Sequence, residues 1–146
     1  MSRKYYLAMG VMATLFLVAV WGCSQKSRPA DSVASFIGAV KNSDAAGIEK
    51  TLLFEKLLLE KEGDNYLKLP PDARKAELEN FKKTLIAELT TGKLKYMGDI
   101  DPKALDEKVS GNKAEVVVKN MKNNSAYRFS LEGEGGVWKI SSISPA

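Results

Sequence analysis

The residue types that carry most enzyme and metal chemistry are scarce in this chain of 146 residues, which has one cysteine and no histidine. Without histidine, His-based zinc sites, Ser-His-Asp triads and Cys-His nucleophile pairs are excluded. With a single cysteine, the chain can form no internal disulfide and no cysteine-rich metal site. We therefore expect no cofactor and no metal, and the chemistry left open belongs to carboxylates, phenols and one thiol.

Carboxylates and tyrosines can carry general acid–base catalysis without a histidine. The candidate acids are Asp99, Asp101 and Glu115, and the candidate phenols are Tyr66, Tyr96 and Tyr127. A catalytic acid needs burial to bring its pKa towards neutrality. The two aspartates instead flank a turn, where Asp bonds to nearby backbone, and Glu115 lies on the polar side of its expected strand. We favour a non-catalytic domain, with an acid-and-tyrosine enzyme as the alternative.

The lone cysteine ends a segment typical of an export signal. Arg3 and Lys4 precede an uncharged run from Leu7 to Gly22, shorter than the about 20 apolar residues that span a bilayer. A basic start, a short apolar run and a small residue at its end indicate a secretory signal peptide. We favour this interpretation over an uncleaved membrane anchor.

Val20, Trp21, Gly22 and Cys23 resemble the lipobox of bacterial lipoproteins, although Trp21 is larger than the residue usual at its position. The resemblance implies that residues 1–22 are a lipoprotein signal peptide. It also implies that the Cys23 thiol takes a diacylglyceryl group and that the new amine is acylated, for example with palmitate. Two or three acyl chains hold a protein on a membrane almost permanently, because each buried methylene contributes about 0.8 kcal/mol.

Residues 23–29 are then the lipidated cysteine and a polar tether, and residues 30–146 form one domain. Ser24 follows the cysteine, where Asp would favour retention in the inner membrane. The resemblance therefore implies a cell-envelope protein sorted to the outer membrane and facing the periplasm. Removing Arg3 and Lys4 lowers the net charge from +4 to +2, and the remaining basic residues are interleaved with acids. Such a mixed surface argues against nucleic acid as a partner.

The first half of the domain has the patterns of three helices. A stripe of Val33, Phe36, Ile37 and Val40 predicts a helix that begins near Pro29. Asp44 can cap a second helix, which is either buried on two sides or bent near Phe54 and which ends at Gly63. The third is expected from Pro70-Pro71-Asp72 to Gly92, with an apolar stripe of Leu78, Phe81, Leu85, Ile86 and Leu89.

After Gly92 the apolar period changes to two, which indicates strands. Leu94, Tyr96 and Gly98 predict one strand, Asp101-Pro102 interrupts, and a weaker strand follows through 105–109. Further strands are expected at 114–118, 127–131 and 138–140, with turns at 111–112, 123–124 and 133–136. This is an antiparallel meander with one apolar face, which the three helices can cover, and the fold class is α+β.

The order of these elements resembles the nuclear transport factor 2-like (cystatin-like) superfamily, and more narrowly its small bacterial lipoproteins of unknown function. The segments that carry the resemblance are 36–44, 114–118, 127–131 and 137–140. It implies a cone in which helices pack on a curved sheet, with room for a pocket between them. It implies no activity, since the superfamily contains binders as well as isomerases that use an acid with a tyrosine.

Tyr96, Tyr127, Phe129 and Trp138 come from three expected strands and are the candidate pocket residues. They could surround an apolar or lipid-like ligand that the tyrosine hydroxyls orient. Plain core packing explains them more simply, and an exposed patch for a partner protein is a third interpretation. The sequence thus predicts a membrane-anchored lipoprotein whose domain binds a ligand or an envelope partner. The alternatives are an isomerase-like enzyme and a structural subunit of an envelope complex.

Overall fold

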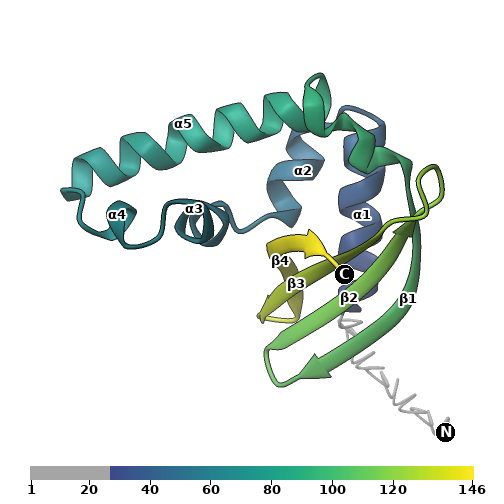
Figure 1. Ribbon diagram of the computed structural model, residues 1–146. Coiled ribbons are helices and arrows are strands. Elements are labelled where there is room, and N and C mark those ends of the chain that lie inside the picture. Colours follow the sequence, from purple (N-terminus) through teal and green to yellow (C-terminus); the bar gives the residue numbers. More distant parts are fainter. Residues whose placement is uncertain (1–26) are drawn as a thin grey trace, which may run out of the picture.

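The computed structural model describes residues 27–146. The signal peptide, the lipobox and Cys23 lie outside the described residues. Helices fill the first half of the described chain and a curved, open antiparallel sheet fills the second half (Figure 1), which confirms the predicted α+β class. The helices are α1 Pro29–Lys41, α2 Ala45–Thr51, α3 Phe54–Glu62, α4 Asp64–Leu67 and α5 Pro71–Thr90. The 3₁₀ helix η1 Lys93–Asp99 leads into β1 Ile100–Ser110, β2 Lys113–Asn120, β3 Ala126–Glu134 and β4 Val137–Pro145.

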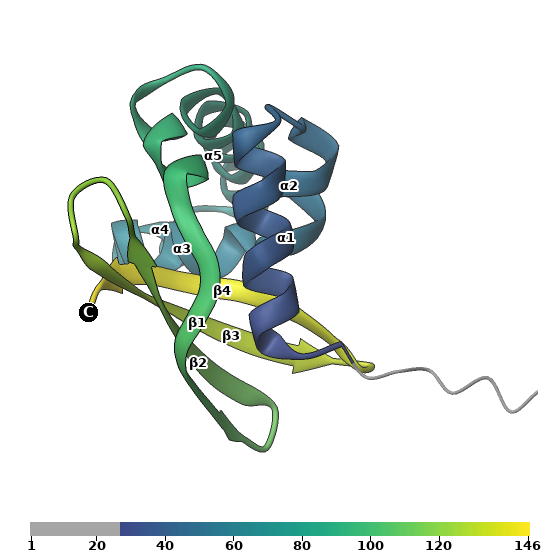
Figure 2. The same ribbon diagram turned by 90° about the vertical axis from the view of Figure 1, so that its right-hand side faces the viewer.

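The core lies between α1 and the sheet. Val33, Phe36 and Val40 of the predicted stripe have no exposed surface, and α1 packs on β1, β2 and β4 (Figure 2). The ring of Phe36 meets that of Phe129 in β3 edge to face, with 5.9 Å between centroids. Such aromatic pairs add about 0.5–1.5 kcal/mol to the gain from burial alone. This contact fixes α1 on the middle of the sheet.

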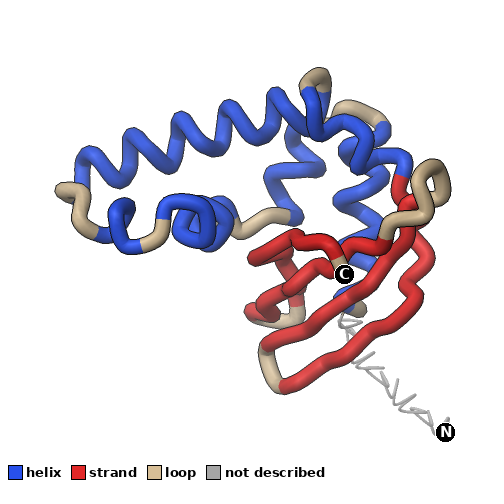
Figure 3. Tube along the Cα trace, in the orientation of Figure 1, coloured by secondary structure: helices blue, strands red, loops and turns tan. Residues whose placement is uncertain are grey.

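The second predicted helix was expected to be either buried on two sides or bent near Phe54, and the structure has the bend. Asp44 caps α2 by accepting a hydrogen bond from the N–H of Gly47 at 3.0 Å. The helix ends at Thr51, and an extended link of Leu52 and Leu53 leads into α3 (Figure 3). In that link the N–H of Leu53 donates to the carbonyl oxygen of Ile140 in β4 at 2.8 Å. The bend therefore arises because the chain leaves the helical conformation to bond to the sheet edge.

The prediction that three helices cover the sheet is wrong for the third one. Helix α5 packs mainly on η1, α3 and α2, and it runs out beyond the sheet (Figure 1). Within its apolar stripe only Leu89 is fully buried, while Leu78, Phe81, Leu85 and Ile86 are half-buried. The reason is that α1 already packs across the apolar face of the sheet, while η1 lies between α1 and α5.

The prediction of a strand at Leu94, Tyr96 and Gly98 is also wrong, because this segment is η1. In a 3₁₀ helix side chains three residues apart lie above one another. Leu94 and Met97 accordingly face the core together. The backbone at Gly98 passes so close to α1 that a Cβ there would lie 2.7 Å from the Cα of Lys41.

The four strands are neighbours in chain order, and each pair is antiparallel. Strand β1 begins at Ile100 and runs through Asp101-Pro102, so this dipeptide does not interrupt it as predicted. A register shift lies between Asp101 and Ala104, and β1 is an edge strand, where proline is tolerated. The β3–β4 turn is shorter than predicted, since only Gly135 and Gly136, both with positive φ, lie between the strands.

Candidate functional site

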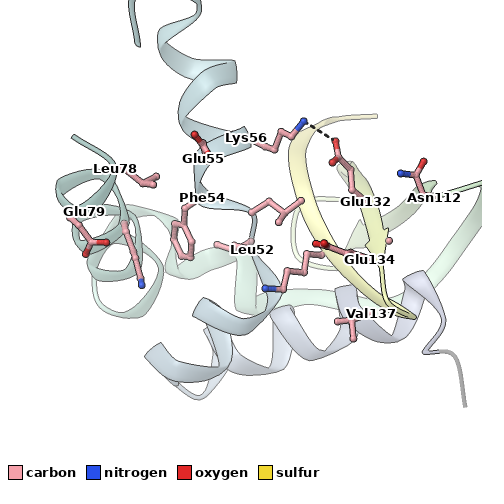
Figure 4. Close-up of a pocket in the computed structure, with 14 residues that line it drawn as sticks. Leu52, Phe54, Glu55, Lys56, Leu78, Glu79, Asn112, Glu132, Glu134 and Val137 are labelled. Carbon is pink, nitrogen blue, oxygen red and sulfur yellow. Dashed lines mark ion pairs between the residues drawn. The ribbon is translucent and has the colours of Figure 1, made fainter. Parts of the chain in front are cut away.

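Two hollows lie on either side of the link between α2 and α3, and Leu52 lines both. The larger is a groove of about 880 Å³ between α3, α5 and the β3–β4 hairpin (Figure 4). The smaller, named here the tyrosine pocket, has about 420 Å³ and lies between α3, α5, η1 and the C-terminal end of β4. They differ in the chemistry of their walls.

The larger groove is lined by charges of both signs, four acids and three lysines, and some of them are already paired. Seven of its fourteen lining residues are charged. Lys56 pairs with Glu132 at 3.5 Å (Figure 4), and Lys82 pairs with Glu49. The hydrogen bond to Glu49 raises the pKa of Lys82 above its usual range. A charged ligand would have to compete with these partners, so the groove is the weaker candidate.

The tyrosine pocket has an almost entirely apolar wall. Its only charged lining residue is Glu60. The apolar lining comes from helices α3 and α5, the link before α3, η1 and strand β4: Leu52, Leu57, Phe81, Leu85, Leu89, Leu94, Met97, Ile143 and Pro145. Small-molecule sites are typically apolar clefts with a few polar groups that fix the ligand's orientation. The tyrosine pocket has this composition.

Two of the four predicted residues line the pocket and bring hydroxyl groups to it. Tyr96 from η1 and Tyr127 from β3 lie side by side, with ring centroids 6.5 Å apart and planes inclined at 43°. Burial raises the pKa of Tyr96, and the neighbouring Tyr127 raises it further. Both phenols carry an O–H that can donate a hydrogen bond. The structure thus brings two phenol hydroxyls to an apolar wall.

The other two predicted residues lie elsewhere. Phe129 has no exposed surface and packs on Phe36, so it belongs to the core. Trp138 is half-buried and lies over Gly133, where a Cβ would come within 3.0 Å of the indole ring. Neither residue lines the tyrosine pocket. They share the apolar face of the sheet with Tyr127 but lie further along the strands.

The acids predicted for catalysis are not gathered around the phenols. Asp99 pairs with Lys122 at 2.6 Å, and Glu115 pairs with Arg128 at 3.2 Å. Asp101 accepts a hydrogen bond from the N–H of Lys103 at 3.0 Å, as expected for a turn-forming aspartate. Of the three predicted phenols, Tyr66 is a buried residue of α4 and lines a different, shallow hollow.

The carboxylate that does line the tyrosine pocket was missed by the sequence prediction. It belongs to Glu60, an exposed residue of α3 whose Oε1 accepts a hydrogen bond from the hydroxyl of Ser142 at 3.1 Å. Glu60 follows Leu57 by three residues, which places both on one face of the helix. That spacing was the available signal, although it does not say what the face packs against.

Within residues 27–146, no helix has the length and apolar character needed to cross a membrane. In the same part of the chain, no three acidic or cysteine side chains gather into a group that could bind a metal.

Comparisons of the chain with protein-family models, with curated proteins and with solved structures found no match. The function is therefore inferred from the residues of the tyrosine pocket and from the N-terminal sequence.

Proposed function

We propose that this chain is a bacterial lipoprotein, anchored in the cell envelope by lipid on Cys23, whose domain binds a small apolar ligand without transforming it. The observation that carries the proposal is the tyrosine pocket, in which an apolar wall meets the phenols of Tyr96 and Tyr127. The lipobox at residues 20–23 supports the anchor. The domain, residues 30–146, is proposed to be nuclear transport factor 2-like on the sequence segments that resemble that superfamily.

The pocket indicates the chemistry of the ligand. Burial of apolar ligand surface contributes about 25 cal/mol per Å², so an apolar wall favours a mostly hydrocarbon molecule. The hydroxyls of Tyr96, Tyr127 and Ser144 offer hydrogen bonds at this wall, which fits a ligand with a small number of carbonyl, ether or hydroxyl oxygens. The only charged lining residue is the acid Glu60, which disfavours an anionic ligand. The ligand class is therefore a small, neutral or weakly cationic apolar molecule.

Binding of a ligand is favoured over docking of a large partner by the distribution of exposed apolar side chains. The most exposed ones are spread over α4, β1, the β2–β3 turn and β4: Leu67, Leu105, Val109, Met121 and Val137. Contiguous apolar patches are what mark protein interfaces. The pocket instead gathers its apolar residues into one concave site.

The binding experiment uses residues 23–146 with Cys23→Ser and the neutral probe N-phenyl-1-naphthylamine. We expect saturable binding of one probe molecule per chain. Leu85→Trp fills the pocket with an indole ring and should weaken binding about tenfold, or 1.4 kcal/mol. Leu67→Trp adds the same ring at a side chain that is 51% exposed, and should leave affinity unchanged. Thermal unfolding of each variant checks the fold, and binding that is non-saturable or equal in both variants contradicts the pocket.

The anchor is tested separately in cells. Inhibition of signal peptidase II should cause the precursor of this protein to accumulate. Cys23→Ser should leave the detergent phase on partitioning, because the acyl chains are lost. A variant that remains in the detergent phase would show that the apolar N-terminus alone holds the protein.

A further inference from the structure

The chain enters the domain beside the β3–β4 turn. The hydroxyl of Ser27 donates to the carbonyl oxygen of Gly136 at 3.1 Å, and α1 begins two residues later at Pro29. Figure 2 shows the start of α1 next to this turn, while the C-terminal end of β4 lies on the other side of the molecule.

The entry point is held by β1 as well. The carboxylate of Glu107 accepts hydrogen bonds from the N–H of Ala30 at 2.9 Å and from the guanidinium of Arg28 at 3.5 Å. The Glu107 side chain is 20% exposed, so water screens these bonds only partly. A carboxylate at a helix N-terminus also interacts favourably with the helix dipole. The β3–β4 turn and strand β1 therefore both hold the first turn of α1 and the residues before it.

Chain length limits how far this entry point can lie from Cys23. Ser27 is four residues after Cys23. Because an extended residue spans at most about 3.6 Å, four residues reach about 14 Å. If Cys23 carries lipid, as the proposed function requires, Ser27 and the turn bonded to it lie within that distance of the membrane surface.

We propose that the β3–β4 turn and the start of α1 dock on the lipid surface and that the tyrosine pocket faces away from it. This inference rests on the lipid anchor of the proposed function. Val137, next to the turn, is an apolar side chain 53% exposed, and the Arg28 side chain is 68% exposed and can meet a lipid phosphate. Glu107, which pairs with Arg28, and Glu134 are acids on this side, so lipid attachment supplies the attraction and net charge does not.

The tyrosine pocket lies at the opposite end of the same strands. Tyr127 pairs with Pro145, whereas Glu134 pairs with Val137 at the turn. The nine residues of β3 span about 30 Å at 3.3 Å per residue. The ligand therefore enters from the aqueous side and does not diffuse sideways out of the bilayer.

The native sequence supplies a reporter for this orientation. Once residues 1–22 are removed, Trp138 is the only tryptophan, and it follows the β3–β4 turn by two residues. Lipidated protein is inserted into phosphatidylethanolamine and phosphatidylglycerol vesicles that contain a dansyl-labelled headgroup lipid. Energy transfer from tryptophan to dansyl then reports distance from the bilayer surface.

The matched protein moves the reporter to the far end of the sheet by combining Trp138→Phe with Met121→Trp. Met121 lies in the β2–β3 turn and is 68% exposed. We expect about twofold or more transfer from Trp138 than from the tryptophan of the second protein, because a strand of about 30 Å separates the two turns. Equal or greater transfer in the second protein, with both proteins floating with the vesicles, overturns the orientation alone. If the processed protein does not float with the vesicles, both the lipid anchor and the orientation are overturned.

A second measurement covers the case in which Trp138→Phe fails to fold. Acylation of Cys23 leaves the mature chain without another thiol. A nitrobenzoxadiazole label on Val137→Cys or on Met121→Cys therefore reports the same two positions with Trp138 in place. Labelled Val137→Cys should be quenched more strongly by spin-labelled headgroups, and equal quenching at both positions overturns the orientation.

Discussion

Leu53 donates its backbone N–H to the carbonyl oxygen of Ile140 at 2.8 Å, so the link between α2 and α3 adds one bridge to the outer edge of β4. The neighbouring residue, Leu52, lines both the larger groove and the tyrosine pocket. This one bond thus positions α3, which forms a wall of each hollow.

Removal of that donor should loosen the link. Leu53→Pro deletes the N–H, and Leu52 already has the extended backbone (φ −108°, ψ 144°) that a residue before proline prefers. We expect the free energy of unfolding to fall by at least about 0.5–1.5 kcal/mol more than in Leu53→Ala, which loses the same side chain and keeps the N–H, because proline also pulls the φ of residue 53 from −97° towards −65°. Urea denaturation measures both variants, and coincident midpoints would show that the bond contributes nothing.

The aromatic residues should separate into core and pocket classes by their effect on stability. Phe129→Ala removes a fully buried ring and its partner contact with Phe36, so we expect a loss of about 3–5 kcal/mol. Tyr96→Ala removes a ring that is 43% exposed and should cost less than about 1.5 kcal/mol. Differential scanning calorimetry compares the two, and similar losses would mean that Tyr96 belongs to the core.

Two glycines should respond in opposite directions to alanine. Gly98→Ala places a Cβ 2.7 Å from the Cα of Lys41, and backbone cannot move aside, so we expect about 1–3 kcal/mol of destabilisation. Gly38→Ala, within α1, has nothing within 4 Å of its Cβ. It should stabilise the protein by about 0.5–1 kcal/mol through helix propensity. Thermal unfolding measures both, and a neutral Gly98→Ala would refute the close approach of η1 to α1.

The Tyr96 phenol should ionise at a higher pH than an exposed tyrosine. Burial raises its pKa, and the nearby Tyr127 adds to the shift. A group whose pKa is raised on folding stabilises the fold below its unfolded pKa, about 10 for tyrosine, and that contribution is lost as pH rises through the folded value. Ultraviolet titration of phenolate, with Tyr96→Phe as the difference reference, measures this pKa. Tyr127→Phe should lower the Tyr96 pKa, and an unchanged titration would exclude the coupling.

Sequence patterns predicted the helices better than the segment that joins them to the sheet. The stripe of α1, the cap at Asp44 and the turn at Gly63 are local features, and each appears where it was expected. Residues 93–99 were misjudged because Leu94, Tyr96 and Gly98 alternate as in a strand. The competing signal was the spacing of three in Leu94, Met97 and Ile100, which matches a 3₁₀ helix and its packing.

The sequence predicted two of its four candidate pocket residues correctly, Tyr96 and Tyr127. Alternation along a strand says which face a residue occupies, so Tyr127, Phe129 and Trp138 were grouped together. Alternation does not say how far along the strand a helix covers that face. Phe129 lies under α1 and Tyr127 beyond it, at the edge of the pocket. The helical wall, including Glu60, depends on how α3 and α5 cross, which no local pattern specifies.

The irregular course of β1 limits how the sheets of two copies of this chain can pair. An edge strand offers unpaired backbone groups to any other chain, and a long flat one invites edge-to-edge aggregation. In β1, Pro102 lacks an N–H, two register shifts twist the strand, and Lys103, Asp106 and Lys108 add charge along it. A bent, charged outer strand therefore resists edge-to-edge pairing when copies of this chain meet at high concentration.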